Sequence, residues 1–164
     1  MINRPFATAA FVLVIVSAPV AWADFTGRVV KVQDGDSITV LVDKQQIKVR
    51  LESIDAPELS QAFGRRSRES LADLCAGKSA TVIETGRDRY QRTLGWVRCG
   101  DVEANSEQIR QGMAWVFKRY VPVGSPLYEL EGYARLRHIG LWEDAQPTAP
   151  WEWRALKKRG EVGR

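Results

Sequence analysis

The chain has 164 residues, and 24 lysines and arginines against 20 aspartates and glutamates give it a formal net charge of +4. This mild basic excess suits a polyanionic partner but does not identify one. The single histidine, His138, lies far from any acidic cluster and is typical of a cation at a helix C-terminus, which excludes a histidine triad and a histidine-rich zinc site. Hydrolytic chemistry in this chain therefore has to use carboxylates, arginines and a metal ion.

Residues 1–23 have the pattern of a signal peptide. Arg4 precedes an apolar run over 9–16, and Ala21-Trp22-Ala23 is a small-x-small cleavage site. The apolar run is shorter than the about 20 residues that a membrane-spanning helix needs. An uncleaved anchor and a buried helix are the alternatives. We expect cleavage after Ala23, export to the periplasm or the medium, and no membrane contact after cleavage.

The remaining chain predicts alternating strands and helices of one domain. Apolar residues at every second position indicate five short strands, near 30–32, 38–42, 47–51, 81–85 and 93–99. Helical spacing predicts helices over about 63–75, over about 102–111 with Asp101 as the cap, and from Ser125-Pro126 to Gly140. This order fits an α+β, mainly β fold, in which a small barrel carries three packed helices.

The two cysteines, Cys75 and Cys99, favour a disulfide. An exported chain meets an oxidising environment, where paired cysteines become oxidised. Two separate thiols in the core are the alternative.

Two short segments combine acidic residues with arginine: Asp-Gly-Asp-Ser over 34–37, and the stretch 50–58. Phosphodiester hydrolysis needs a positioned water and stabilisation of the charge that develops on the phosphate oxygens. A hard cation takes oxygen ligands, and the planar fork of arginine suits phosphate. Each acid taken singly is typical of a solvated turn, but the combination predicts a phosphodiesterase. Strand alternation turns Arg50 away from the core, so that it can reach a ligand.

Four segments resemble the staphylococcal nuclease (thermonuclease) family. They are residues 32–37, 50–58, 88–92 and 140–142, in the family's order, within a match that runs from about Thr26 to Trp142. The resemblance implies a five-stranded OB-type barrel with three helices over residues 24–145, followed by a C-terminal tail over 146–164. It also implies a Ca²⁺-dependent endonuclease that hydrolyses DNA and RNA at the P–O5′ bond and leaves 3′-phosphates. We expect a monomer.

The resemblance also implies roles for individual residues. Asp36 and Asp55 match the calcium carboxylates, and Ala56 matches a ligand that binds through its backbone carbonyl. Glu58 matches the general base or water positioner. The other matches are Arg50 and Arg92 for transition-state charge, Asp34 for orienting the metal site, Arg89 and Tyr90 for a terminal phosphate, and Tyr120 for the nucleoside.

The sequence departs from the family pattern at some positions and leaves other function classes open. Lys118 replaces a substrate-side tyrosine, and Gln91 replaces a turn glycine, which predicts strain before Arg92. A non-catalytic OB-fold module that binds nucleic acid is the main alternative, and a structural or interaction domain is another. Neither alternative explains three acids near two arginines, because carboxylates repel phosphate. In the tail, Trp151 and Trp153 are more typical of packing against the barrel than of base stacking.

Overall fold

The structure is a computed structural model that describes residues 24–162, so the predicted signal peptide lies outside the described residues. Over this range no helix is long and apolar enough to cross a membrane.

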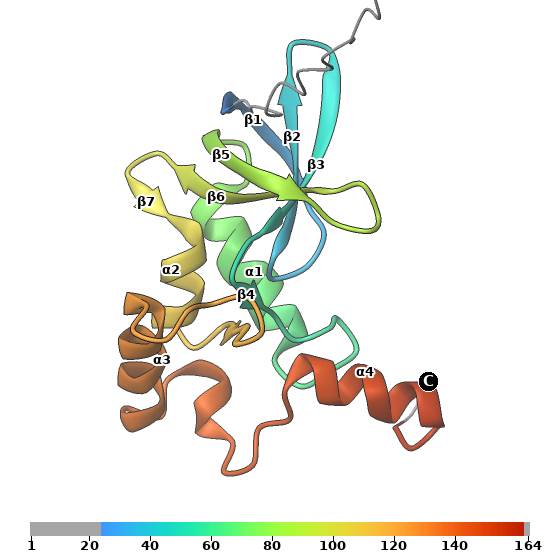
Figure 1. The fold of residues 1–164 in the computed structure, drawn as a ribbon, viewed down its shortest axis with the longest axis vertical. Helices are drawn as coiled ribbons and strands as arrows, with labels where there is room; N and C mark the ends of the chain where they lie inside the picture. The colour runs from blue at the N-terminus through green and yellow to red at the C-terminus, as the bar shows by residue number, and fades with distance from the viewer. Residues whose placement is uncertain (1–23, 163–164) are drawn as a thin grey trace, which may run out of the picture.

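Five strands form a closed barrel (Figure 1). They are β1 (Phe25–Val32), β2 (Ser37–Val42), β3 (Gln45–Leu51), β5 (Ser79–Arg87) and β6 (Thr93–Cys99). The strand order is β3-β2-β1-β5-β6, and a parallel pairing between β3 and β6 closes the barrel, with Val49 opposite Thr93. The alternating apolar side chains of these strands fill the interior. The predicted barrel is confirmed.

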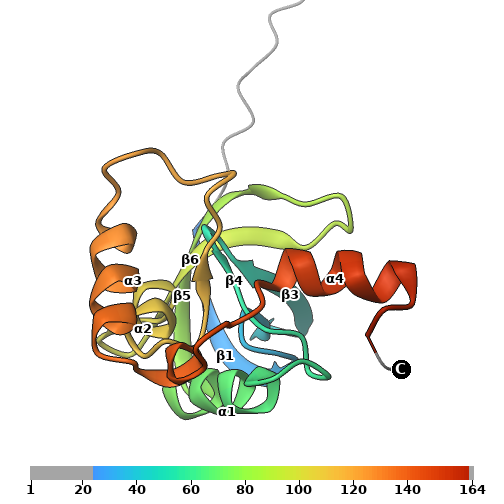
Figure 2. The same cartoon turned by 90° about the horizontal axis from the view of Figure 1, so that it is seen from below.

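Short strands attach the remaining segments to this barrel. β4 (Ile54–Asp55) pairs with β8 (Trp115–Val116), and β7 (Val102–Glu103) extends the sheet beside β6. The helices are α1 (Gly64–Cys75), α2 (Ala104–Arg110), α3 (Pro126–Leu136) and α4 (Pro150–Arg159), with the 3₁₀ turn η1 over Gly140–Glu143. Helices α1, α2 and α3 lie against one end of the barrel, whereas α4 lies on the opposite side from α3 in both views (Figures 1 and 2).

Three helix predictions need correction. Helix α3 ends at Leu136 and not at Gly140, which instead begins the 3₁₀ turn η1. Helix α2 begins at Ala104 and not at Val102, because Val102 and Glu103 pair with β6. Its cap is Glu103 and not Asp101: the Glu103 carboxylate accepts hydrogen bonds from the N–H groups of Asn105 and Ser106. The segment expected to be a simple tail contains a fourth helix, α4, which starts at Pro150, ends at Arg159 and is capped by Gly160 in the left-handed conformation.

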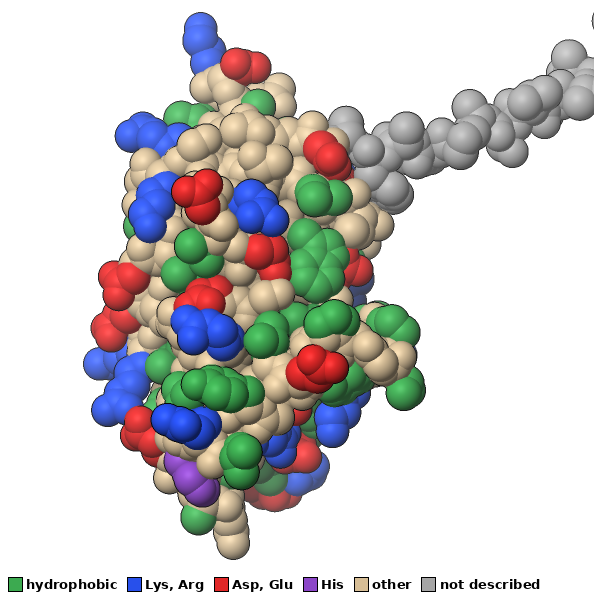
Figure 3. Space-filling model, turned by 90° about the vertical axis from the view of Figure 1, so that its left-hand side faces the viewer, with side chains coloured by type: hydrophobic (Ala, Val, Ile, Leu, Met, Phe, Trp, Pro, Cys, Tyr) green, Lys and Arg blue, Asp and Glu red, His purple; other side chains and the backbone are tan. Residues whose placement is uncertain are grey.

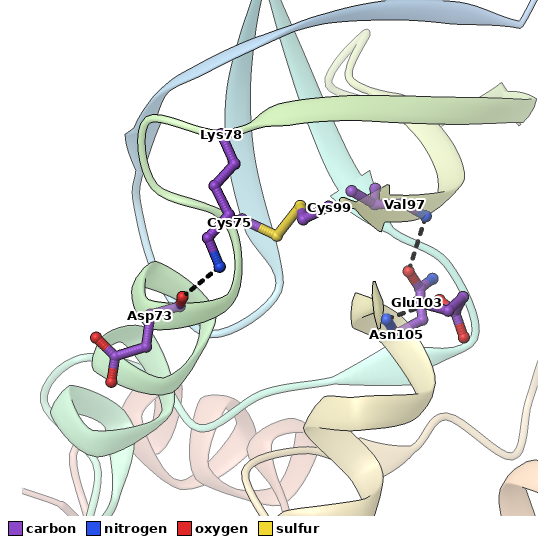
Figure 4. The surroundings of a disulfide bond; sticks show 7 residues. All are labelled: Asp73, Cys75, Lys78, Val97, Cys99, Glu103 and Asn105. Atoms are coloured by element: carbon purple, nitrogen blue, oxygen red, sulfur yellow. Dashed lines mark hydrogen bonds between the residues drawn. A yellow bond between two sulfur atoms is a disulfide. The ribbon is translucent and has the colours of Figure 1, made fainter. Parts of the chain in front are cut away.

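A disulfide joins Cys75, at the end of α1, to Cys99, at the end of β6 (Figure 4). Their Cα atoms are 5.2 Å apart, and both residues are buried in the same apolar core. Beside the bond, Asn105 of α2 accepts a hydrogen bond from the backbone N–H of Val97 at 3.0 Å. The disulfide thus fixes α1 to the strand that α2 also holds.

The surface over α2 and α3 mixes basic, acidic and apolar side chains (Figure 3). The excess of positive charge is therefore not gathered on this face.

Candidate active site

One guanidinium links the two acids that the sequence predicts as metal ligands. Arg50, on β3, donates from Nη1 to Asp36 Oδ1 and from Nη2 to Asp55 Oδ1, the latter at 2.7 Å. Asp36 and Asp55 are 2% and 0% exposed, so both charges depend on protein partners. The β4–β8 pairing positions Asp55 opposite Trp115. Arg50 and Asp55, from the predicted motif over 50–58, therefore lie together with Asp36 from the motif over 34–37.

The turn before β2 holds Asp36 in place. Asp34 Oδ1 accepts the N–H of Asp36 at 3.1 Å. The backbone N–H of Ala56 donates to Asp36 Oδ2 at 2.8 Å. The carbonyl of Gly35 accepts a hydrogen bond at 2.7 Å from the fully buried side chain of Gln108 on α2. A side chain of helix α2 therefore fixes the backbone of the turn that carries Asp36.

Arg92 lies at the other side of the same turn. Its Nη1 donates to Ser37 Oγ at 3.3 Å, and Ser37 Oγ in turn donates to Asp36 Oδ1 at 2.9 Å. Asp88 fixes the guanidinium through a 2.8 Å bond from Arg92 Nε. Gln91, which replaces the family's glycine, adopts a φ of 62°, so the predicted strain falls in the left-handed region.

The predicted substrate contacts lie on the surface. Tyr90 is 65% exposed, and the guanidinium of Arg89 lies 4.7 Å from its ring centroid, with that of Arg92 at 5.7 Å. Tyr120 is 61% exposed and packs edge-on against Phe117, with centroids 5.0 Å apart. Both tyrosines are available to a bound nucleotide, while the basic residues beside Tyr90 suit a phosphate.

Glu58 joins the network through a residue that the sequence did not suggest. Arg154, on α4, donates to Glu58 Oε1 at 2.9 Å and to both oxygens of Asp55, at 3.2 Å and 2.7 Å. Gln61 strengthens this link: its Oε1 accepts the N–H of Glu58, and its Nε2 donates to the carbonyl of Thr148 at 2.6 Å. The five residues assigned to catalysis and metal binding by their side chains are thus connected in one network.

Burial and charge shift the pKa values of the site. Burial, together with the charge of Asp36, raises the pKa of Asp34 to about 6. Burial also raises the pKa of Asp55, although hydrogen bonds from Arg154 oppose this shift. Burial alone would lower the pKa of Arg50, but Asp36 and Asp55 outweigh it and raise the pKa. The site therefore concentrates negative charge that favours a bound cation.

The donor atoms fit a hard divalent cation better than a soft one. Asp36 and Asp55 offer carboxylate oxygens beside the Ala56 backbone, and within the described part of the chain their hydrogen-bond partners include no thiolate or imidazole. Over residues 24–162, no three acidic, histidine or cysteine side chains form a ready-made metal cluster. A cation at this point would therefore take two carboxylates and complete its shell with backbone and water oxygens.

The known proteins that this chain resembles include several nucleases. A family model described as "Staphylococcal nuclease homologue" matches residues 48–144. The chain is 46% identical over 162 residues to a micrococcal nuclease of Shigella flexneri, and this match covers 93% of this chain and 92% of that protein. It is 45% identical over 147 residues to an uncharacterized endonuclease of Escherichia coli, covering 89% of this chain and 95% of that protein. A staphylococcal-like nuclease of Arabidopsis thaliana is 31% identical over 116 residues, 71% of this chain and 36% of that protein.

Proposed function

Because this chain belongs to the staphylococcal nuclease family and is a nuclease, we propose that it is a Ca²⁺-dependent endonuclease that hydrolyses DNA and RNA. Cleavage at the P–O5′ bond, leaving 3′-phosphates, and a monomeric enzyme are parts of the same proposal. The observation that supports it most is the bridge that Arg50 makes between Asp36 and Asp55. A phosphate at this point would meet an arginine fork next to the carboxylates that suit a cation.

In this proposal each residue has a separate task. Asp36, Asp55 and the Ala56 carbonyl hold calcium, which supplies charge for the transition state when it is bound. Glu58, whose side chain is 42% exposed, can reach a water and either orient it or take its proton. Arg50, which is bonded to Asp36, and Arg92, which is bonded to the neighbouring Ser37, stabilise the oxygens on which charge develops.

Cleavage of labelled DNA and RNA with calcium, with magnesium and with a chelator tests this function. We expect cleavage with calcium, weak cleavage with magnesium and none with the chelator, because magnesium demands near-octahedral geometry that few protein ligands here provide. A phosphatase that removes the 3′-phosphate from the products identifies the bond that is cut. DNA binding without cleavage in calcium would favour a non-catalytic OB-fold module instead.

Export is a further part of the proposal. The Cys75–Cys99 disulfide supports it, because such bonds persist in oxidising compartments. Mass spectrometry of protein from cell fractions should find the chain outside the cytoplasm with Asp24 as its first residue. An intact Met1 in the cytoplasmic fraction would contradict this expectation.

A further inference from the structure

Helix α4 brings a third arginine into the active site, which the proposed roles leave unused. Arg154 contacts Asp55, the fully buried predicted metal ligand, and Glu58, the predicted water positioner. Its fork lies end-on against the Asp55 carboxylate, with Nη1 on Oδ1 and Nη2 on Oδ2. Arginine binds phosphate with the same two-pronged geometry.

The backbone that carries Arg154 is firmly held. Trp151, three residues earlier and on the same side of α4, stacks on Phe117 with an interplanar angle of 12° and meets Trp115 edge-on. The Gln61–Thr148 hydrogen bond fixes the segment that leads into the helix. Trp151 of the tail therefore packs on these rings, whereas Trp153 lines a pocket together with Pro57 and Phe63. These contacts hold the backbone of Arg154 where its side chain can reach Asp55 and Glu58.

The guanidinium itself is less restrained than its anchor. The Arg154 side chain is 43% exposed, whereas that of Arg50 is 17% exposed and held by two buried aspartates. Arg92 is committed to Asp88. Arg154 is therefore the arginine of the site that can change partners with the smallest loss of buried contacts.

The balance of charge at the site indicates when Arg154 exchanges its partners. Among the described residues, the salt bridges to the carboxylates of Asp36, Asp55 and Glu58 come from Arg50 and Arg154, and Arg92 reaches Asp36 only through the Ser37 hydroxyl. A divalent cation on Asp55 would use the same oxygens that Arg154 contacts and would supply the missing positive charge. The arginine is then free beside Glu58, where the scissile phosphate is expected.

Resting on the proposed function, we propose that Arg154 is a substrate-binding residue that exchanges partners. It pairs with Asp55 and Glu58 until a divalent cation takes Asp55, and it then binds a phosphodiester oxygen of the nucleic acid. Helix α4 is thus a wall of the active site, and Arg154 competes with the cation but assists the substrate.

Calcium titration by calorimetry, without nucleic acid, tests the first half. Arg154→Gln should bind calcium about two- to fivefold more tightly, the equivalent of one partly exposed ion pair. Arg159→Gln is the matched control, because it removes the same charge from the same helix at a residue that pairs with Glu161. Its calcium affinity should equal that of the wild type.

Steady-state cleavage of a short fluorogenic DNA at saturating calcium tests the second half. Arg154→Gln should raise KM about tenfold, as the loss of a charge-assisted phosphate contact predicts, while kcat changes less. The slope of log(kcat/KM) against the logarithm of the salt concentration should become shallower by about one, which corresponds to the loss of one phosphate contact. Arg154→Lys retains the charge but not the fork and should fall between the wild type and Arg154→Gln in both assays, even where the glutamine variant folds poorly.

Unchanged calcium affinity and unchanged KM in both Arg154 variants would overturn the inference while leaving the nuclease intact. Weaker calcium binding in a folded Arg154→Gln variant would also overturn it, because Arg154 would then support the cation rather than compete with it. A wild-type protein that neither binds calcium nor cleaves DNA would overturn the proposed function as well.

Discussion

Asp88 and Arg92 form a hydrogen-bonded pair at the edge of the site. Asp88 Oδ2 accepts the Nε–H of Arg92 at 2.8 Å, and Asp88 Oδ1 accepts the backbone N–H groups of Tyr90 and Arg92. Partial burial would raise the pKa of Asp88, but these hydrogen bonds hold it below its ordinary value. One carboxylate therefore sets both the turn and the direction of the guanidinium.

Asp88→Asn should cost about 1 kcal/mol of folding free energy at neutral pH, since one charged hydrogen bond to Arg92 is lost. A folded-state pKa below the unfolded value of about 3.9 means that this stabilisation is present above pH 4 and disappears as pH falls through the lower pKa. Urea unfolding at pH 7 and pH 3 checks the difference between wild type and variant. The exposed residue Asp101, replaced by asparagine, serves as control. A difference that grows below pH 4 would contradict the assignment.

Glu58→Gln should lower kcat about 100- to 10,000-fold, the range for loss of a general base or water positioner. The amide keeps the size of the side chain but cannot accept a proton. Oligonucleotide binding, measured by fluorescence anisotropy in calcium, should stay near the wild-type value because Arg50 and Arg92 remain. Turnover within about threefold of the wild type would mean that Glu58 lacks this role.

Gly35→Ala should destabilise the turn that carries Asp36. A Cβ there would lie 1.7 Å from Ser67 Oγ and 2.8 Å from Ala56 Cβ. Overpacking of this kind typically costs about 1–3 kcal/mol, which thermal unfolding would detect. Gly86→Ala is the control, since a Cβ at that position meets no atom within 4 Å.

Adding Ser67→Ala to Gly35→Ala removes the nearest clashing atom, so the two substitutions should cost less together than the sum of their separate costs. If Gly35→Ala unfolds at the wild-type temperature, the close contact between the turn and α1 is not present in solution.

Loss of the Cys75–Cys99 bond should lower stability without removing the site. The bond closes a loop across 24 positions, for which chain entropy predicts about 3.5 kcal/mol. Calorimetric unfolding of the Cys75→Ala, Cys99→Ala double variant checks this value, with DNA cleavage at low temperature as the test of the site. When the wild-type protein is treated with a reductant, its stability should fall to that of the variant only after partial unfolding exposes the bond, because both cysteines are buried.

The sequence predicts the barrel because each barrel strand carries its own alternating pattern. Val49 and Leu51 are buried on either side of Arg50, as period-two alternation requires. The predicted acids and arginines also lie together, since most belong to short motifs at strand ends. Their catalytic roles remain predictions.

Arg154 was missed because its contacts depend on the folded chain. It lies 99 positions from Asp55, and an arginine in a basic segment carries no mark of a buried acidic partner. The helix that holds it had visible signals, namely Pro150 at its start, basic residues in its last turn and Gly160 after it. The short β7 pairing, which moved the start of α2, had none.

The parallel pairing of β3 with β6 has a consequence for how inactivation begins. It sets Arg50 opposite Leu94 and places Arg92 directly before Thr93, the partner of Val49. The two arginines are neighbours only while this seam holds, so an opening of the seam separates them before the rest of the fold is lost. Partly opened molecules should therefore be inactive. During heating, activity should be lost at a lower temperature than the one at which circular dichroism detects unfolding.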